Sequence, residues 1–541
     1  MALPRLPLAL LVAAALAACA APSTAPDVTY TDAAAAPDAA PHSSPAPPPV
    51  DTREGPVVGF RDGGVDRYYG IPFAAPPVGD LRWRSPRPAD RRDTTLFATA
   101  FSADPVSHNV WGDMRYRSPG FAEDCLYLNV WVPARDAASA RAGLPVLLYF
   151  YGGGLIAGGA SETRYDGAAL AREGIVVVTA NYRLNVFGRL AHPELSAEDP
   201  AGGSGNYAYR DQLAALRWVR DNIGAFGGDP AHITVGGESA GSISVSTLLA
   251  NPAASELIAG AIGQSGAAVE PLYHPVPLAE AEAVGAAFAK TIGAPTLAAL
   301  RALPADTLYA RYLRWGGSLP LTFDGEAVTQ TVEQAYARGD VPAIPLLAGW
   351  NSREAGVESI TDGEPLTRAR FERGVRERYP AVAAQLLSAL DYDGPERLAA
   401  TAQTIANDAW IAYPTWRWTE AHARLAGGPT YRYYYDHPRP GQTGGAPHAA
   451  EIPYALGNLD VHPAFAWTEA DHATSATMSA YFANFVKTGN PNADGLPDWP
   501  PQTPGGRVQP VMRIAPQSEL IRVDDAHRAV IARQYASAAT N

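Results

Sequence analysis

The chain has 541 residues, of which 47% are hydrophobic and 18% are charged, a composition typical of a globular protein rather than a disordered or fibrous one. Its formal net charge of −13 at pH 7 argues against nucleic acid as a partner, because phosphate binding depends on clusters of Lys and Arg. Gly and Pro are frequent, at 50 and 49 residues, so many turns and irregular loops are expected.

The first residues have the pattern of a bacterial lipoprotein signal. Arg5 precedes an apolar run over residues 6–18 that is too short to span a bilayer and matches a secretory signal peptide. The run ends in the letters LAAC, which resemble a lipobox, where cleavage before the Cys exposes it for lipidation. We expect residues 1–18 to be the signal peptide and the protein to be exported, with membrane contact only through lipid on Cys19. The alternative is an ordinary signal peptide that happens to contain a Cys.

The segment after Cys19 has the composition of a tether. It consists almost entirely of Ala, Pro, Ser, Thr and Asp and lacks the large apolar residues that offset the entropy of ordering. We therefore predict a flexible tether over residues 19–51. From Thr52 onward the composition is globular, with no second linker and no internal repeat, so residues 52–541 are predicted to form a single catalytic domain. The chain has only one other Cys, Cys125, so a lipidated Cys19 leaves no internal disulfide.

Alternating strand and helix patterns within this domain predict an α/β fold. The helical pattern is clearest over Tyr209–Ile223, where four large apolar residues could share one face. Strands that alternate with helices indicate a mostly parallel sheet, in which sites form beyond the carboxyl ends of the strands. Six apolar runs rich in β-branched and aromatic residues predict the strands: Leu126–Val132, Val146–Tyr151, Ile175–Tyr182, Ile233–Val235, Ile344–Ala348 and Tyr431–Tyr435.

The predicted strand Ile233–Val235 leads into the letters GGESAG at residues 236–241. This is a G-x-S-x-G pattern between a predicted strand and a predicted helix, the context of a nucleophile elbow centred on Ser239. The glycines suit a tight turn in which a side chain would collide with the backbone. A serine hydroxyl needs a base to remove its proton and an acid to orient that base, and in this fold class the acid and then the His follow the Ser along the chain.

Two histidines follow the last predicted strand closely enough to act as the base. His437 comes directly after Tyr431–Tyr435, and His448 lies further on in a loop with two adjacent glycines that could reach back to the Ser. These local features favour His448 only slightly over His437.

Candidates for the acid and for the oxyanion hole follow two other predicted strands. Glu354 is the first carboxylate after Ile344–Ala348, and Glu358 is its rival. Val146–Tyr151 leads into three glycines at residues 152–154, where a substrate carbonyl could approach backbone N–H groups. A phosphate-binding loop is the competing interpretation, but the glycines lack the Lys-Ser/Thr ending of a Walker loop and the spacing of a dinucleotide fingerprint.

From about Gly55 to the C-terminus the sequence resembles the type B carboxylesterase family, which also contains cholinesterases and catalytically silent neuroligin-like adhesion domains. The letters FGGDP at residues 226–230, continued through Gly241, follow the family's active-serine signature, and EDCLYLNV at residues 123–130 follows its second signature. Other matching stretches are YGIPF and PPVG within residues 69–79, NYRL at 181–184 and GNPN at 489–492.

The resemblance implies an α/β-hydrolase fold, with a mostly parallel central sheet flanked by helices and with large loop and helical insertions. It implies a carboxylic-ester hydrolase that forms an acyl-enzyme on a small-molecule ester and needs no cofactor or metal ion. Glu354 matches the family's Glu in a Gly-x-Asn-x-x-Glu stretch, and His448 matches the His three residues before Glu-Ile. The implied site residues are a triad of Ser239, His448 and Glu354 and oxyanion donors on Gly153, Gly154 and Ala240.

The chain also departs from the family pattern. The family often joins the Cys of its Asp-Cys-Leu motif to an earlier Cys in an Ala-Cys-Pro context, where this chain has Asp104, so Cys125 lacks that partner. We expect the intervening loop, which contains Trp111, to differ in shape, and cholinesterase specificity is not carried over. Tyr151 stands where many relatives have His.

Two residues near the motifs allow two interpretations each. Glu238, beside the nucleophile, could lend negative potential to the site or anchor the elbow by hydrogen bonds. Ser265 resembles a position close to the triad His but could equally be a plain turn at a strand end. Two other functions stay open at this point, namely a lipase acting on long-chain lipid esters and a non-catalytic cholinesterase-like binding module.

Overall fold

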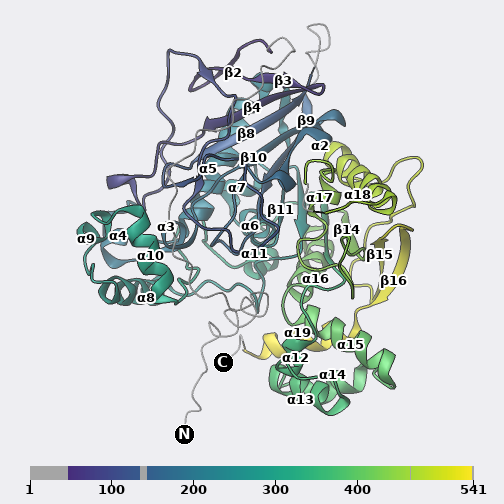
Figure 1. The fold of residues 1–541 in the computed structure, drawn as a ribbon. Coiled ribbons are helices and arrows are strands. Elements are labelled where there is room, and N and C mark those ends of the chain that lie inside the picture. The colour runs from purple at the N-terminus through teal and green to yellow at the C-terminus, as the bar shows by residue number, and fades with distance from the viewer. Residues whose placement is uncertain (1–46, 135–142, 463–464, 539–541) are drawn as a thin grey trace.

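The computed structural model describes residues 47–134, 143–462 and 465–538 (Figure 1). The expected signal peptide, the lipidated Cys19 and most of the expected tether lie outside these residues. The first described strand, β1 (Val50–Thr52), pairs antiparallel with β2 (Gly55–Val58). In the described part of the chain, no helix combines the length and the apolar character needed to cross a membrane.

An 11-stranded sheet forms the centre of the molecule, as expected for an α/β-hydrolase fold (Figure 1). Its strands from β10 to β15 in spatial order pair in parallel, while the strands at both edges pair antiparallel. The mostly parallel sheet predicted from the sequence is therefore confirmed. In spatial order the strands are β16 (Glu519–Asp524), β15 (Val508–Ile514), β14 (Thr430–Tyr435), β13 (Leu346–Asn351), β12 (Gly260–Gln264), β11 (Gly228–Glu238), β9 (Leu144–Phe150), β10 (Val176–Ala180), β8 (Tyr127–Pro133), β4 (Val65–Pro72) and β3 (Phe60–Asp62).

All six strands expected from the sequence are present, with ends shifted by a few residues, whereas β3, β4, β12, β15 and β16 of the central sheet were not expected. The sequence of β12, GAIGQ, contains two glycines and resembles a turn. The packing explains the glycine in its middle, because a Cβ built on Gly263 would lie 2.2 Å from the Trp418 ring. Small residues are needed here so that a helix can pack closely on the sheet. Short strands outside the central sheet are β5 (Leu96–Phe97), β6 (Asp104–Pro105) and β7 (Phe121–Ala122).

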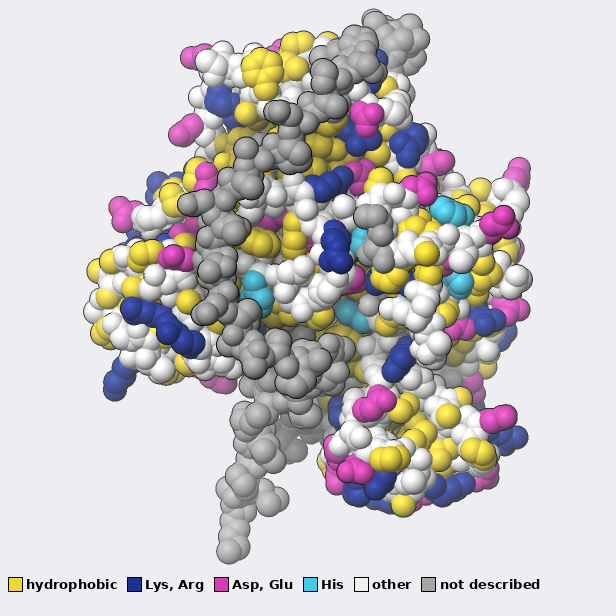
Figure 2. All heavy atoms as spheres, in the orientation of Figure 1, with side chains coloured by type: hydrophobic (Ala, Val, Ile, Leu, Met, Phe, Trp, Pro, Cys, Tyr) yellow, Lys and Arg dark blue, Asp and Glu magenta, His cyan; other side chains and the backbone are white. Residues whose placement is uncertain are grey.

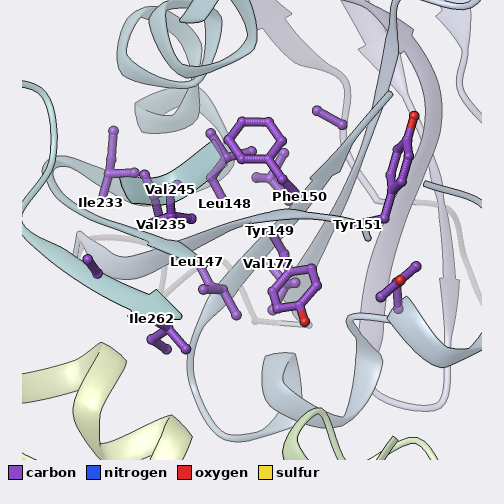
Figure 3. Close-up of a cluster of buried hydrophobic side chains, with 14 of the residues drawn as sticks. Leu147, Leu148, Tyr149, Phe150, Tyr151, Val177, Ile233, Val235, Val245 and Ile262 are labelled. Carbon is purple, nitrogen blue, oxygen red and sulfur yellow. The ribbon is translucent and has the colours of Figure 1, made fainter. Parts of the chain in front are cut away.

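The core lies along the middle strands of the sheet (Figure 3). Every residue of β10 and of β12 is buried, so both faces of the sheet are covered. The expected helix corresponds to α5 (Tyr207–Asn222), which packs on β11 together with α6 (Ala240–Leu249). Of the other helices, α2 (Ala168–Arg172), α16 (Ala412–Ala421) and α18 (Glu469–Thr488) pack on strands of the sheet. The helix α3 (Asn185–Arg189) packs on α5, α7 (Pro252–Ser255) and α11 (Val332–Arg338) pack on α6, and α17 (Ile452–Ala455) packs on α18.

Two helical insertions extend from this framework, and each has a small apolar core of its own. The first surrounds Phe288 and Leu308, and the second surrounds Phe371 and Ile405. The second insertion projects from the main body at the lower right of Figure 2, where charged side chains of both signs are interspersed on its surface. The helices of the first are α4 (Pro193–Glu198), α8 (Leu278–Thr291), α9 (Leu297–Arg301) and α10 (Ala305–Trp315); those of the second are α12 (Glu358–Thr361), α13 (Arg368–Arg378), α14 (Ala383–Ala389), α15 (Pro395–Asp408) and the C-terminal α19 (Ala526–Ala538).

Candidate active site

Ser239 lies at the sharp turn between β11 and α6. Its backbone has φ 53° and ψ −119°, a combination that non-glycine residues seldom adopt and that costs about 1–3 kcal/mol. A Cβ built on Gly237 would lie 2.5 Å from the carbonyl carbon of Gly241, and one built on Gly241 would lie 2.1 Å from the carbonyl oxygen of Phe150. The two glycines therefore permit the strained turn that holds the Ser239 hydroxyl beyond the end of the strand.

The structure brings Ser239, His448 and Glu354 together in one hydrogen-bonded row. Nε2 of His448 lies 2.9 Å from Oγ of Ser239, and Nδ1 of His448 lies 2.6 Å from Oε2 of Glu354. With its Nδ1–H donating to the carboxylate, a neutral imidazole presents Nε2 as an acceptor to the serine hydroxyl. This is the geometry that general-base activation of a serine requires.

Glu354 is buried and is fixed by donors on its other oxygen. Oε1 accepts hydrogen bonds from the Ser265 hydroxyl and from the backbone N–H of Asn351, both at 2.6 Å. The structure thus places Ser265 against the carboxylate rather than against the imidazole of His448. Bonded on both oxygens, the Glu354 carboxylate has little freedom to rotate away from His448.

The two rival residues lie elsewhere. Nε2 of His437 lies 2.8 Å from Oδ1 of Asp471, in the first turn of α18. Glu358 is exposed in the first turn of α12. Neither belongs to the row that contains Ser239.

Glu238 is buried beside the same imidazole. Its Oε1 lies 3.3 Å from Nε2 of His448 and, among the described residues, has no hydrogen-bond donor. Burial raises the pKa of Glu238 to about 8. Burial also opposes protonation of His448, but the negative charges of Glu238 and Glu354 outweigh it and raise the pKa of the imidazole above its ordinary value. A proton on Glu238 removes part of that effect, so Glu238 and His448 titrate as a pair.

Sequence reasoning missed two further neighbours of His448. Glu451 is fully buried, and its carboxylate accepts hydrogen bonds from the side-chain amides of Asn351 at 2.6 Å and Gln264 at 3.2 Å. Its place in the Glu-Ile pair that located His448 was a usable signal. Trp410, whose ring centroid lies 4.6 Å from that of His448, stands in the turn between α15 and α16, and no motif marks it.

The glycine-rich loop after β9 lies directly against the nucleophile turn. A Cβ built on Gly152 would come within 2.4 Å of Oε2 of Glu238 and 3.2 Å of Cβ of Ser239. Gly153 and Gly154 have φ values of 111° and 64°, and their N–H groups donate to no protein acceptor within the described ranges. These amides are therefore available to a ligand beside Ser239.

Two further features frame this glycine-rich loop. Ala240 is the first residue of α6, where the backbone N–H has no acceptor in the preceding turn of its own helix. Tyr151, just before the glycines, stacks on Tyr182 with a centroid separation of 4.2 Å. The hydroxyl of Tyr151 donates to the carbonyl of Tyr182 at 3.0 Å, and the hydroxyl of Tyr182 donates to the carbonyl of Tyr151 at 2.6 Å. This reciprocal pair fixes the start of the loop.

The stretch that departs from the family pattern is held without a disulfide. Cys125 is buried and carries a free thiol. Asp104 is also buried, and its Oδ2 accepts a 2.5 Å hydrogen bond from the hydroxyl of Ser161. The intervening chain is further joined by the parallel pairing of β6 with β7.

Comparisons with known proteins agree on one family. The sequence model of the Carboxylesterase family matches residues 46–530. The chain is 33% identical over 485 residues to the fumonisin B1 esterase of Sphingopyxis macrogoltabida, which covers 83% of each protein. It is 34% identical over 468 residues to the para-nitrobenzyl esterase of Bacillus subtilis (strain 168), covering 83% of this chain and 92% of that protein.

Solved structures give the same result. A PNB esterase structure superposes with a TM-score of 0.75 at 30% identity, covering 89% of this chain and 99% of that one. A carboxylesterase of Geobacillus stearothermophilus gives the same TM-score, identity and coverage. The chain therefore belongs to the carboxylesterase family and is a carboxylic-ester hydrolase.

Proposed function

We propose that the ester bond is cleaved through an acyl-enzyme on Ser239. His448 takes the hydroxyl proton as Ser239 attacks the ester carbonyl, and then gives that proton to the leaving alcohol. Water, activated by the same imidazole, hydrolyses the acyl-enzyme. Glu354 orients the imidazole and stabilises its cation. The observation that carries this proposal is the row of 2.9 and 2.6 Å hydrogen bonds that joins the three side chains.

The negative oxygen that develops during attack would be held by the backbone N–H groups of Gly153, Gly154 and Ala240. The unpaired amides of the two glycines and the helix N-terminus at Ala240 support this assignment. Loss of one such donor is expected to lower turnover by about 10²–10³-fold.

Hydrolysis of p-nitrophenyl acetate tests the proposal. The wild-type protein is expected to turn over, whereas Ser239→Ala and His448→Ala are expected to fall by several orders of magnitude with unchanged folding. A wild-type protein that shows no turnover with any of a panel of esters would instead support the non-catalytic binding module. The intact triad favours the enzyme.

The substrate is proposed to be a small-molecule ester. Two similar proteins are named for esterase activity on fumonisin B1 and on para-nitrobenzyl esters, and an ester panel that varies the acyl and alcohol groups would define the preference here. The alternative is a lipase. Rates that rise sharply above the solubility limit of long-chain esters would favour the lipase, and rates that saturate below that limit would favour the carboxylesterase.

We also propose that the enzyme is exported and anchored to a bacterial membrane by lipid on Cys19. The support is the apolar run with its LAAC ending followed by a tether-like composition. Labelled palmitate should be incorporated by the full chain and not by Cys19→Ala. Incorporation that survives this substitution would contradict the proposal.

A further inference from the structure

Arg439 is a buried arginine whose guanidinium contacts the backbone directly after His448. It lies in the loop that follows β14 and is 3% exposed. Nη2 donates to the carbonyl of Ala449, and Nε donates to the carbonyl of Ala450 at 3.4 Å. Within the described ranges, no other donor reaches either carbonyl. The carbonyl oxygens of Ala449 and Ala450 therefore depend on one side chain for their hydrogen bonds.

The chain at Ala449 needs such support. Its φ of 64° lies in the left-handed region, which is unfavourable for a residue with a side chain. The strained residue turns the chain immediately after His448, between the loop from β14 and the helix α17. A donor that binds its carbonyl oxygen stabilises this turn, and the turn sets the direction from which the imidazole approaches Ser239.

The charge of Arg439 is balanced by a carboxylate from a distant part of the sequence. Nη1 lies 2.9 Å from Oδ2 of Asp113, which also lies 3.5 Å from Nη1 of Arg164. Burial acts to raise the pKa of Asp113, but the two guanidinium groups hold it well below its ordinary value, so the carboxylate stays ionised. Removal of the Asp113 charge would leave the buried Arg439 guanidinium without its carboxylate, which is costly.

Asp113 also connects this ion pair to the oxyanion loop. The next residue, Met114, is buried, and its methyl carbon would lie 3.5 Å from a Cβ built on Gly153. Arg439 thus joins the turn after His448 to the segment that packs against the expected oxyanion donors. Both halves of the site are tied to one cluster, which consists of Arg439, Asp113 and Arg164.

We propose that Arg439 is a positioning residue for His448, acting through the carbonyls of Ala449 and Ala450 and itself oriented by Asp113. The inference rests on the proposed triad. It assigns to Arg439 an effect on the chemical step, separate from any effect on stability, because a displaced imidazole no longer meets the serine hydroxyl in line. A displacement of about 1 Å is enough to lower turnover by as much as 10²-fold.

The test compares Arg439→Met and Arg439→Lys with a matched control. Arg117→Met removes another arginine of the same region, which pairs with Asp166 at 2.5 Å and makes no contact with residues 448–450. With p-nitrophenyl acetate, Arg439→Met is expected to lower kcat at least about 10-fold while KM changes less than about threefold. Arg439→Lys should recover part of the loss, because it restores the charge and a single donor.

The pH profile provides a readout that loss of stability alone would not change. A looser contact between His448 and Glu354 should move the acid limb of kcat/KM of Arg439→Met to lower pH. Asp113→Asn should also lower kcat. If Arg439→Met does not fold, Arg439→Lys and Asp113→Asn decide the question by the same split between kcat and KM.

Two results would overturn the inference. One is a folded Arg439→Met enzyme with wild-type kcat and acid limb and only a lower Tm. The other is an equal fall in kcat for Arg117→Met, which would indicate general loosening of the region. Failure of the triad is distinguishable, because it would appear as absent turnover in the wild type or as undiminished turnover in Ser239→Ala.

Discussion

Replacement of Glu238 by Gln tests how the site sets the protonation of His448. The substitution keeps the shape of the side chain but removes a carboxylate that lies 3.3 Å from Nε2 of His448. At that distance two unit charges attract by about 5 kcal/mol at an effective dielectric constant of 20. The rise in the pKa of Glu238 from its ordinary 4.5 to about 8 corresponds to about 5 kcal/mol opposing ionisation, at 1.36 kcal/mol per pH unit.

The pKa of about 8 already includes the attraction of the His448 cation, which lowers it, so the cost of burial exceeds that attraction and Glu238 is protonated in many molecules near neutral pH. Only the fraction of molecules with an ionised Glu238 stabilises the imidazolium. Glu238→Gln removes that fraction, so the pKa of His448 falls and the neutral base persists to lower pH. We expect the acid limb of kcat/KM to move down by about one pH unit, and not by the three or more that a permanently ionised neighbour would give.

The assay is the pH dependence of kcat/KM for p-nitrophenyl acetate, which reports the pKa values of the essential ionising groups in the free enzyme. Glu358→Gln, which neutralises an exposed carboxylate of α12, serves as the control and should leave the acid limb in place. An acid limb that stays fixed or moves upward in Glu238→Gln would refute the reasoning. It would mean that Glu238 carries its proton throughout, or that its role is confined to anchoring the turn.

Three further predictions follow from single contacts. Ser265→Ala removes a donor to Glu354 and should lower kcat about 10-fold with little change in KM, which steady-state kinetics would detect. Gly241→Ala forces a Cβ to within 2.1 Å of the Phe150 carbonyl and should give a misfolded enzyme or a clearly lower Tm by calorimetry. Burial lowers the pKa of His422 to about 4, so the unfolded chain binds this proton first, and stability is expected to fall by about 3 kcal/mol between pH 6.5 and 4. Urea unfolding should show a smaller fall in His422→Gln.

The strands of the sheet were predictable where they are long and apolar. They were not predictable where contact with a distant helix requires a small residue in the strand. The strand β9 (Leu144–Phe150) reads as a buried strand because both of its faces are covered by apolar neighbours. The strand β12 lies in an equally buried position, but Gly263 is forced by the approach of Trp418. Local propensity cannot reveal such a contact, because its cause is a helix more than 150 residues away in the chain.

The residues of the candidate site also differ in how clearly the local sequence reveals them. Ser239 was identifiable because its turn, its glycines and its strand are contiguous in the sequence. His448 and Glu354 were only slightly favoured over His437 and Glu358, since the reach of a loop across the sheet is a tertiary property. The family resemblance resolved what local sequence left open, and the distances of 2.6 and 2.9 Å agree with that choice.

Contacts that depend on distant segments left no trace in the sequence. Arg439 meets Asp113 from more than 300 residues away, and Trp410 reaches His448 from the turn between two insertion helices. Neither residue belongs to a motif. Such partners become visible only when the fold has brought the segments together.

Trapping of the covalent intermediate tests the central claim most directly. The enzyme would be mixed with p-nitrophenyl acetate, quenched in acid within the first turnovers and digested for mass spectrometry. The account predicts a burst of p-nitrophenol and an acetyl group on the peptide that contains Ser239, both absent in Ser239→Ala. Turnover without a burst, or acetylation of another residue that persists in Ser239→Ala, would contradict it.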